Sequence, residues 1–233
     1  MLELMQRRLR YSAQSSFRLY HLCYYFSKSD KNDEDKKLII DFKKGKEAAV
    51  RHFIVKALAF LEHHEMDEHL TILRPLHSHE TYIRCEAPTP LDRLGWSLAT
   101  VFDCLYTQDV LQKIRTTQPV KSLTIEQRVA ELNGVYRIDT KNYDFNNQKL
   151  LIIDDVVTTG ATVCSIISTI LKAFPLAKIN VLSLAWTPTA GQQAYIQNHY
   201  EDNSMMLKEP ESLYGSTVDG DFLNGKTYVS LFV

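Results

Sequence analysis

The chain has few cysteines and no excess charge of one sign, and both features exclude classes of protein. Its 4 cysteines, Cys23, Cys85, Cys104 and Cys164, lie far apart and form no C-x-x-C pair. That spacing excludes a zinc ribbon and favours reduced thiols in a cytoplasmic protein. The 27 basic and 28 acidic residues give a net charge of −1, which argues against direct binding to nucleic acid.

Long apolar runs are also missing. No stretch reaches the roughly 18 apolar residues of a membrane-spanning helix. The N-terminus, MLELMQRRLRYSAQSS, has no uninterrupted apolar segment of the kind found in secretory signals. We therefore expect no membrane partner. Hydrophobic residues make up 45% of the chain, which is enough for a sizeable core.

Hydrophobic periodicity predicts strands and helices in alternation. Apolar residues near a 3.6-residue period predict a helix over 45–64. A second helix begins at Thr89, because Pro90 suits the first helical position and Asp92 completes a capping pattern. This alternation implies an α/β fold with a mostly parallel, open sheet flanked by helices. The other predicted elements are a helix at 161–174 and strands at 69–76, 109–115, 134–138, 149–153 and 178–186.

Composition divides the chain into a core and two extensions. We predict an α/β core over residues 36–187. Residues 1–35 have loosely helical spacing and are predicted as a helical N-terminal extension. Residues 188–233 are polar and rich in turns, and Asn224-Gly225 marks a hairpin in this C-terminal extension. The apolar run 38–42 fits either a strand or the start of a helix.

One stretch, KLLIIDDVVTTGATVCSII at 149–167, carries the strongest functional signal. Asp154 and Asp155 follow a buried strand, and a loop of small residues, 158–162, leads into a helix. Ligands bind beyond the carboxyl ends of parallel strands, and amides at a helix N-terminus attract anions. The loop therefore predicts a monophosphate cradle. The acids would repel phosphate, so they suit hydroxyl groups or a bound cation, as in ribose 5-phosphate.

A second interpretation of the paired acids is the Walker B strand of a nucleotide hydrolase. A Walker A pattern does occur at 220–227, GDFLNGKT. It requires a helix after the lysine and threonine, whereas only YVSLFV follows and is typical of a strand. The two patterns also occur in reverse order. We favour a hairpin at 220–227.

The segment LLIIDDVVTTGAT, 150–162, resembles the phosphoribosyl-diphosphate (PRPP) motif of type I phosphoribosyltransferases. Together with LIIDFKKGKEAAVRHFIVKALA and IRTTQPVKSLTIEQRVAELNGVYRI, it resembles the ComF-like branch of that family. The zinc finger that usually begins ComF-like proteins is missing, so the chain resembles a divergent member of that branch. The resemblance implies the type I phosphoribosyltransferase fold, PRPP as donor and Mg²⁺ as cofactor.

The resemblance also implies roles for particular residues. Asp154 and Asp155 would be catalytic, would hold the ribose hydroxyls and would bind Mg²⁺ through water. Arg115 and Arg128 would be catalytic, because they bracket a flexible loop that neutralises the departing pyrophosphate. The substrate-binding set would be Val156, Val157, Thr158, Thr159, Gly160, Ala161 and Thr162 for the 5-phosphate, and Arg74, His77, Ser78 and His79 for the pyrophosphate.

Two functions remain open from the sequence. The first is transfer of the phosphoribosyl group to a nitrogenous acceptor, which a hood built from 1–35 or from the C-terminal extension would recognise. The second is a catalytically silent protein of the same fold that senses PRPP or a nucleotide 5-phosphate and signals to a partner. The resemblance also implies a homodimer or another protein partner. It leaves the acceptor unidentified.

Overall fold

The computed structural model describes residues 17–26, 34–66, 69–83, 87–118 and 123–188. The predicted hairpin at Asn224-Gly225 and the extension from residue 189 onward lie outside the described residues. Across the described part of the chain, no helix has both the length and the hydropathy needed to cross a membrane.

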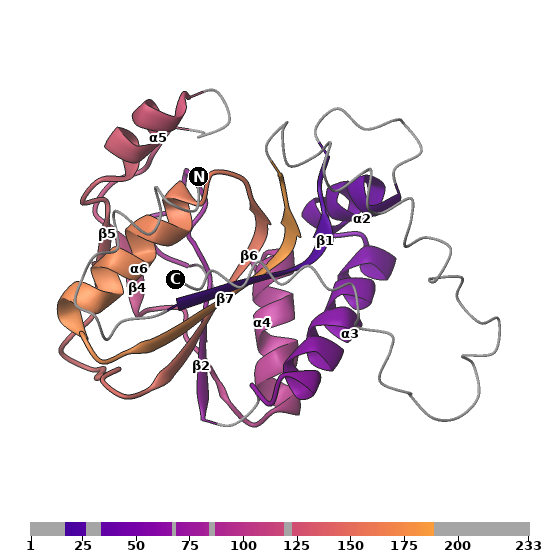
Figure 1. The fold of residues 1–233 in the computed structure, drawn as a ribbon, viewed down its shortest axis with the longest axis horizontal. Coiled ribbons are helices and arrows are strands. Elements are labelled where there is room, and N and C mark those ends of the chain that lie inside the picture. Colours follow the sequence, from indigo (N-terminus) through magenta and orange to yellow (C-terminus); the bar gives the residue numbers. More distant parts are fainter. Residues whose placement is uncertain (1–16, 27–33, 67–68, 84–86, 119–122, 189–233) are drawn as a thin grey trace.

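A parallel sheet forms the centre of the molecule (Figure 1). Its 5 strands lie in the order β1-β7-β6-β2-β3, and every neighbouring pair is parallel. The predicted mostly parallel sheet flanked by helices is therefore confirmed. The strands are β1 (Phe17–Tyr24), β2 (Leu70–Leu73), β3 (Leu105–Tyr106), β6 (Lys149–Val157) and β7 (Lys178–Trp186).

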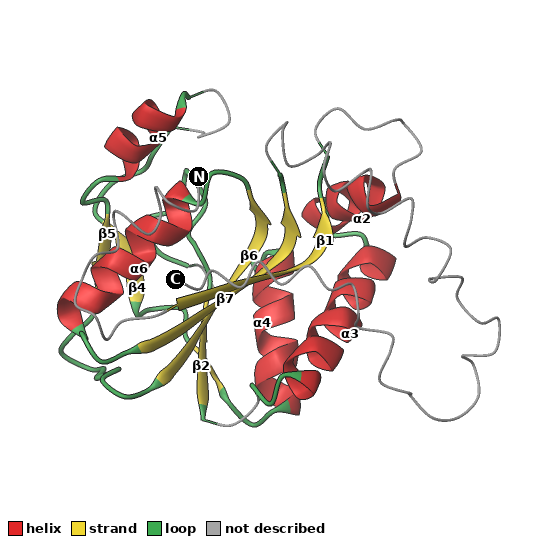
Figure 2. Ribbon diagram, viewed as in Figure 1, coloured by secondary structure: helices red, strands yellow, loops and turns green. Residues whose placement is uncertain are grey.

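Helices cover both faces of this sheet (Figure 2). One face packs against α2 (Glu34–Lys43), α3 (Glu47–His63) and α4 (Pro90–Val101). The other face packs against α6 (Ala161–Ala173) and an antiparallel pair, β4 (Leu111–Lys113) with β5 (Tyr136–Ile138). The short helix α5 (Ile125–Leu132) connects β4 to β5 and lies against α6.

Local sequence explains where the central helices begin. The Thr89 hydroxyl accepts a hydrogen bond from the Asp92 amide at 3.2 Å, and the Asp92 carboxylate accepts one from the Thr89 amide at 2.7 Å. This capping box with Pro90 in the first turn confirms the predicted start of α4. Thr124 and Gln127 form a second capping box at the start of α5.

The N-terminal part of the chain differs from the prediction. Residues 17–24 form the edge strand β1, paired in parallel with β7, so the prediction of a helical extension is wrong there. Side chains of β1 join the apolar clusters on both faces of the sheet, and this packing together with the pairing to β7 outweighs a loosely helical pattern. The ambiguous run 38–42 belongs to α2.

Candidate functional site

The turn between β6 and α6 forms a small cup at the carboxyl edge of the sheet. Gly160 is the N-cap of α6 with φ 69°, a left-handed conformation that glycine adopts without steric cost. The cup encloses a cavity of about 60 Å³. Its lining is Arg128, Asp154, Val156, Val157, Thr158, Thr159, Gly160, Ala161, Thr162 and Val163. The loop predicted to hold a phosphate therefore surrounds one cavity together with one acid and one arginine.

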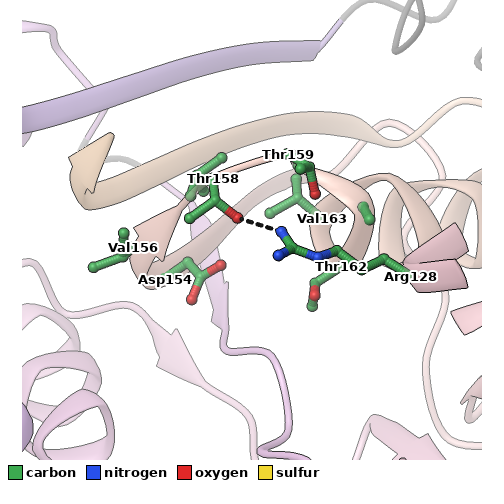
Figure 3. A pocket seen from close by; sticks show the side chains of 10 residues that line it. Arg128, Asp154, Val156, Thr158, Thr159, Thr162 and Val163 are labelled. Atoms are coloured by element: carbon green, nitrogen blue, oxygen red, sulfur yellow. Dashed lines mark hydrogen bonds between the residues drawn. The ribbon is translucent and has the colours of Figure 1, made fainter. Parts of the chain in front are cut away.

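Asp154 is the acid that faces this cup (Figure 3). Its Oδ1 accepts a hydrogen bond from the Asp155 amide at 2.8 Å. Burial, and then the neighbouring Asp155 charge, raise the pKa of Asp154 well above its ordinary value. Asp154 is half-buried, and the hydrogen bond from the Asp155 amide uses only part of the acceptor capacity of its carboxyl. The rest can accept a ligand's hydroxyl groups or bind a cation.

Asp155 has a different environment. It does not line the cup, and successive side chains of a strand point to opposite faces of a sheet. Its Oδ2 lies 3.1 Å from Nζ of Lys43, the last residue of α2. The two acids are thus separated: Asp154 is available to a ligand, while Asp155 is held in an ion pair on the α2 side.

Arg128 reaches the cup from α5. Its Nη1 donates to the Thr158 hydroxyl at 3.4 Å (Figure 3), and its Nε donates to the Leu123 carbonyl at 3.0 Å. The guanidinium and the Asp154 carboxyl face the same space. A fixed cation at this point can neutralise an anion bound in the cup.

Arg115 does not lie in the cup. Its Nη1 donates to the Glu131 carboxylate at 2.8 Å, and its Nη2 donates to the Glu131 carbonyl at 2.8 Å. Arg115 therefore ties the C-terminal end of α5 to the segment after β4. The role of Arg115 at the substrate stays a prediction, and in this structure its guanidinium is paired with Glu131.

Arg74 is a core residue, with 1% of its surface exposed. Its Nε donates to Asp92 at 2.6 Å, its Nη1 donates to Glu80 at 2.8 Å and to the Pro75 carbonyl, and its Nη2 donates to both acids. The five donors of a guanidinium are thereby used. The prediction that Arg74 binds pyrophosphate is corrected, since no donor is left for a ligand.

The loop 77–79 follows β2 and lies beside the acids of β6. Glu80 accepts a hydrogen bond from the His77 amide at 2.6 Å, and the His77 and His79 rings stack 5.8 Å apart. Burial lowers the pKa of His77, and the negative charges of Glu80 and, to a smaller extent, Asp155 partly offset that effect. None of His77, Ser78 and His79 lines the cup. The loop therefore lies at the same carboxyl edge of the sheet as the cup but outside its cavity.

Three residues near the site were missed from the sequence: Lys43, Lys113 and Tyr136. Lys113 has 6% of its surface exposed, and its Nζ lies 5.6 Å from the centre of the Tyr136 ring. Burial, and then the Asp154 charge, raise the pKa of Tyr136. Lys43 and Tyr136 lie within the segments 38–59 and 114–138 that resemble the ComF-like branch, but nothing in those segments marks either residue as part of a site. The one feature of the sequence that could have indicated Lys113 is its position on the apolar side of a strand in which apolar and polar residues alternate.

The donor set suits a magnesium ion that arrives with its ligand. Among the described residues, no group of three or more His, Cys, Asp or Glu side chains could hold a metal. Asp154 presents a single carboxyl beside the threonine hydroxyls of the cup. Mg²⁺ keeps several waters and is held by one or two carboxylates plus substrate phosphates, so these residues fit it.

Comparisons with known proteins found similar structures but no similar sequence family. No family model matches the chain, and no curated protein matches it. A purine phosphoribosyltransferase from Pyrococcus horikoshii Ot3 is 18% identical over 60% of this chain and 73% of its own, with a TM-score of 0.36. A hypoxanthine phosphoribosyltransferase from Staphylococcus aureus is 14% identical over 60% of this chain and 67% of its own, with a TM-score of 0.36.

A third similar structure is the hypoxanthine phosphoribosyl transferase of Trypanosoma cruzi, which is 12% identical over 67% of this chain and 76% of its own, with a TM-score of 0.35. At these identities and TM-scores, no property of the three enzymes transfers to this chain. The functional argument therefore rests on the cup itself.

Proposed function

We propose that this protein is a Mg²⁺-dependent phosphoribosyltransferase that binds PRPP at the β6–α6 cup and transfers the phosphoribosyl group to a nitrogenous acceptor. The observation that carries the proposal is the placement of the Asp154 carboxyl beside a helix N-terminus lined by hydroxyl groups. The cup suits a phosphate and the carboxyl suits a diol, and a ribose 5-phosphate has both. The resemblance of 150–162 to the PRPP motif, and of the wider core to the ComF-like branch, supports the same proposal.

The 5-phosphate would lie in the cup. Backbone N–H groups of the first turn of α6 have no partners within the helix and can donate to phosphate oxygens. Thr158, Thr159 and Thr162 add hydroxyl donors. The helix N-terminus contributes about 0.5–2 kcal/mol to binding of the anion, and each hydrogen bond to a charged group contributes about 1.5–3 kcal/mol.

Asp154 would accept hydrogen bonds from the ribose hydroxyls. The positive charge that develops on the ribose ring as the bond to pyrophosphate breaks would favour the ionised form of this carboxyl, whose pKa burial raises, and that form would stabilise the ring. The nitrogen of the acceptor forms the new bond to C1 of the ribose, and pyrophosphate leaves with the electron pair. Mg²⁺, when bound, neutralises charge on the pyrophosphate. Arg128 would add a second cation on the α5 side of the cup.

The loop 77–79 would hold the pyrophosphate. It lies at the carboxyl end of β2, the strand next to β6, so it can reach a group attached to C1 of a ribose seated at Asp154. The charge of Asp155 acts on His77, which supports this closeness. Pyrophosphate release from PRPP with magnesium, measured with a panel of purine and pyrimidine bases, tests the proposed transfer.

The double variant Asp154→Asn with Asp155→Asn should keep the fold and lose PRPP affinity. Circular dichroism checks the fold, and calorimetry with magnesium and PRPP measures binding. Unchanged affinity in the folded double variant refutes the proposed site.

The second candidate function is a protein of the same fold that senses PRPP or a nucleotide 5-phosphate without catalysis. The Lys43–Asp155 ion pair supports it, because it leaves only one acid for the ligand. A sensor binds PRPP in calorimetry and releases no pyrophosphate with any base of the panel. A homodimer or another protein partner would receive the signal, and sedimentation with and without PRPP tests that arrangement.

A further inference from the structure

Lys113 is a buried cation outside the cup, and it contacts the loop 77–79 directly. Its Nζ donates to the His77 carbonyl at 2.8 Å and to the Thr117 hydroxyl at 3.2 Å. The Thr117 amide donates to the Ser78 carbonyl at 2.8 Å. The Lys113 amide donates to the Thr81 carbonyl at 2.8 Å. The loop is therefore fastened to β4 and to the segment after it through its carbonyl groups.

This fastening determines where the amides of the loop point. The described residues contain no cis peptide bond, and in a trans peptide the C=O of one residue and the N–H of the next point in opposite directions. Because the His77 and Ser78 carbonyls point toward Lys113 and Thr117, the Ser78 and His79 amides point away from them. Among the described residues, neither amide has a hydrogen-bond partner.

Two successive amides that share one side of a loop, without protein partners, form a concave site for an anion. We propose that Lys113 is a positioning residue that holds the loop 77–79 in this anion-binding conformation, with the pyrophosphate group as the occupant. The inference rests on the proposed function, because a pyrophosphate bound here is the part of PRPP that extends from the cup toward β2.

The environment of Lys113 supports a structural use of its charge. Only 6% of its surface is exposed, and burial lowers its pKa to about 8. A buried ammonium is costly unless its donors are satisfied, and the His77 carbonyl and Thr117 hydroxyl satisfy two of its three. The side chain is thereby held against the loop.

Calorimetry on the full chain tests the inference with two probes, inorganic pyrophosphate with magnesium and ribose 5-phosphate. Lys113→Met removes both hydrogen bonds and keeps most of the side-chain length. We expect pyrophosphate to bind about tenfold or more weakly and ribose 5-phosphate to bind within about twofold of the wild type. Arg137→Met is the matched control, because it removes an exposed cation from β5, the antiparallel partner strand of β4, and should leave both affinities unchanged.

Thr117→Val separates positioning from direct contact. It keeps the lysine charge and removes the hydroxyl that Lys113 contacts, so pyrophosphate should bind about threefold or more weakly. Unchanged pyrophosphate affinity in either variant overturns the inference, as does an equal loss of both ligands in Lys113→Met. Wild-type protein that binds ribose 5-phosphate but no pyrophosphate overturns this inference alone. Absence of ribose 5-phosphate binding overturns the proposed function itself.

Discussion

Replacing the two adjacent acids one at a time should give very different losses of ligand affinity. Asp154 faces the cup, whereas Asp155 is paired with Lys43 at 3.1 Å. Asp154→Asn removes the charged acceptor for the ribose hydroxyls and keeps the shape of the side chain. Each hydrogen bond to a charged group contributes about 1.5–3 kcal/mol, so ribose 5-phosphate should bind roughly 10- to 150-fold more weakly.

Asp155→Asn should cost far less. The Lys43–Asp155 pair is partly exposed, at 32% and 21% of the two side chains, and such pairs contribute about 0.2–1 kcal/mol. The affinity for ribose 5-phosphate should therefore change by less than about fivefold. Removing the neighbouring charge also leaves Asp154 easier to ionise, which favours the form that binds hydroxyl groups.

Isothermal titration calorimetry with ribose 5-phosphate measures both variants at one pH. Lys43→Met is the matched control, because it breaks the same ion pair from the other side and leaves both acids in place. Equal losses in Asp154→Asn and Asp155→Asn would refute the assignment of one acid to the ligand and one to the ion pair. A larger loss in Asp155→Asn would reverse it.

Three further predictions concern stability. Arg74→Met should lower the free energy of unfolding, measured by guanidinium denaturation, by about 3–5 kcal/mol, because it leaves buried carboxylates unpaired. The control Arg93→Met breaks an exposed ion pair and should lower it by less than about 1 kcal/mol. Gly95→Ala should lower the thermal midpoint, with a cost of about 1–3 kcal/mol, because its Cβ would lie 2.5 Å from the Tyr106 ring; an unchanged midpoint would contradict the packing of α4 on β3. The raised pKa of Asp154 means that the folded protein keeps the carboxyl proton to higher pH than the unfolded chain does. The free energy of unfolding of the wild type, relative to that of Asp154→Asn, should therefore fall as pH rises above about 4. A difference that stays constant in chemical denaturation from pH 4 to 8 would contradict this prediction.

The parts of the site that are contiguous in sequence could be predicted, because a strand, a turn and a helix start are local features. The cup from Thr158 to Thr162 required only the strand before it and the helix after it. The mostly parallel sheet followed from the alternation of apolar strands and amphipathic helices. The capped start of α4 at Thr89 followed from three neighbouring residues.

The parts that depend on long-range contacts could not be predicted. Asp155 looked equivalent to Asp154 until Lys43, distant in sequence, was placed beside it. Arg74 looked available until Asp92 and Glu80 were seen to surround it. A basic residue at the end of a strand has the same sequence signature whether it meets a ligand or a buried carboxylate, and only the packing of α4 decides between them.

The placement of β1 changes where the chain can safely be shortened. A truncation at residue 36, the boundary that composition suggests, would remove the strand that covers one side of β7. The backbone N–H and C=O groups of Lys178–Trp186 would then be open to pairing with other molecules. Loss of solubility in such a fragment would reflect an uncovered sheet edge. The same cut would remove Tyr24, which packs on Trp186 at the edge of the sheet where the cup opens.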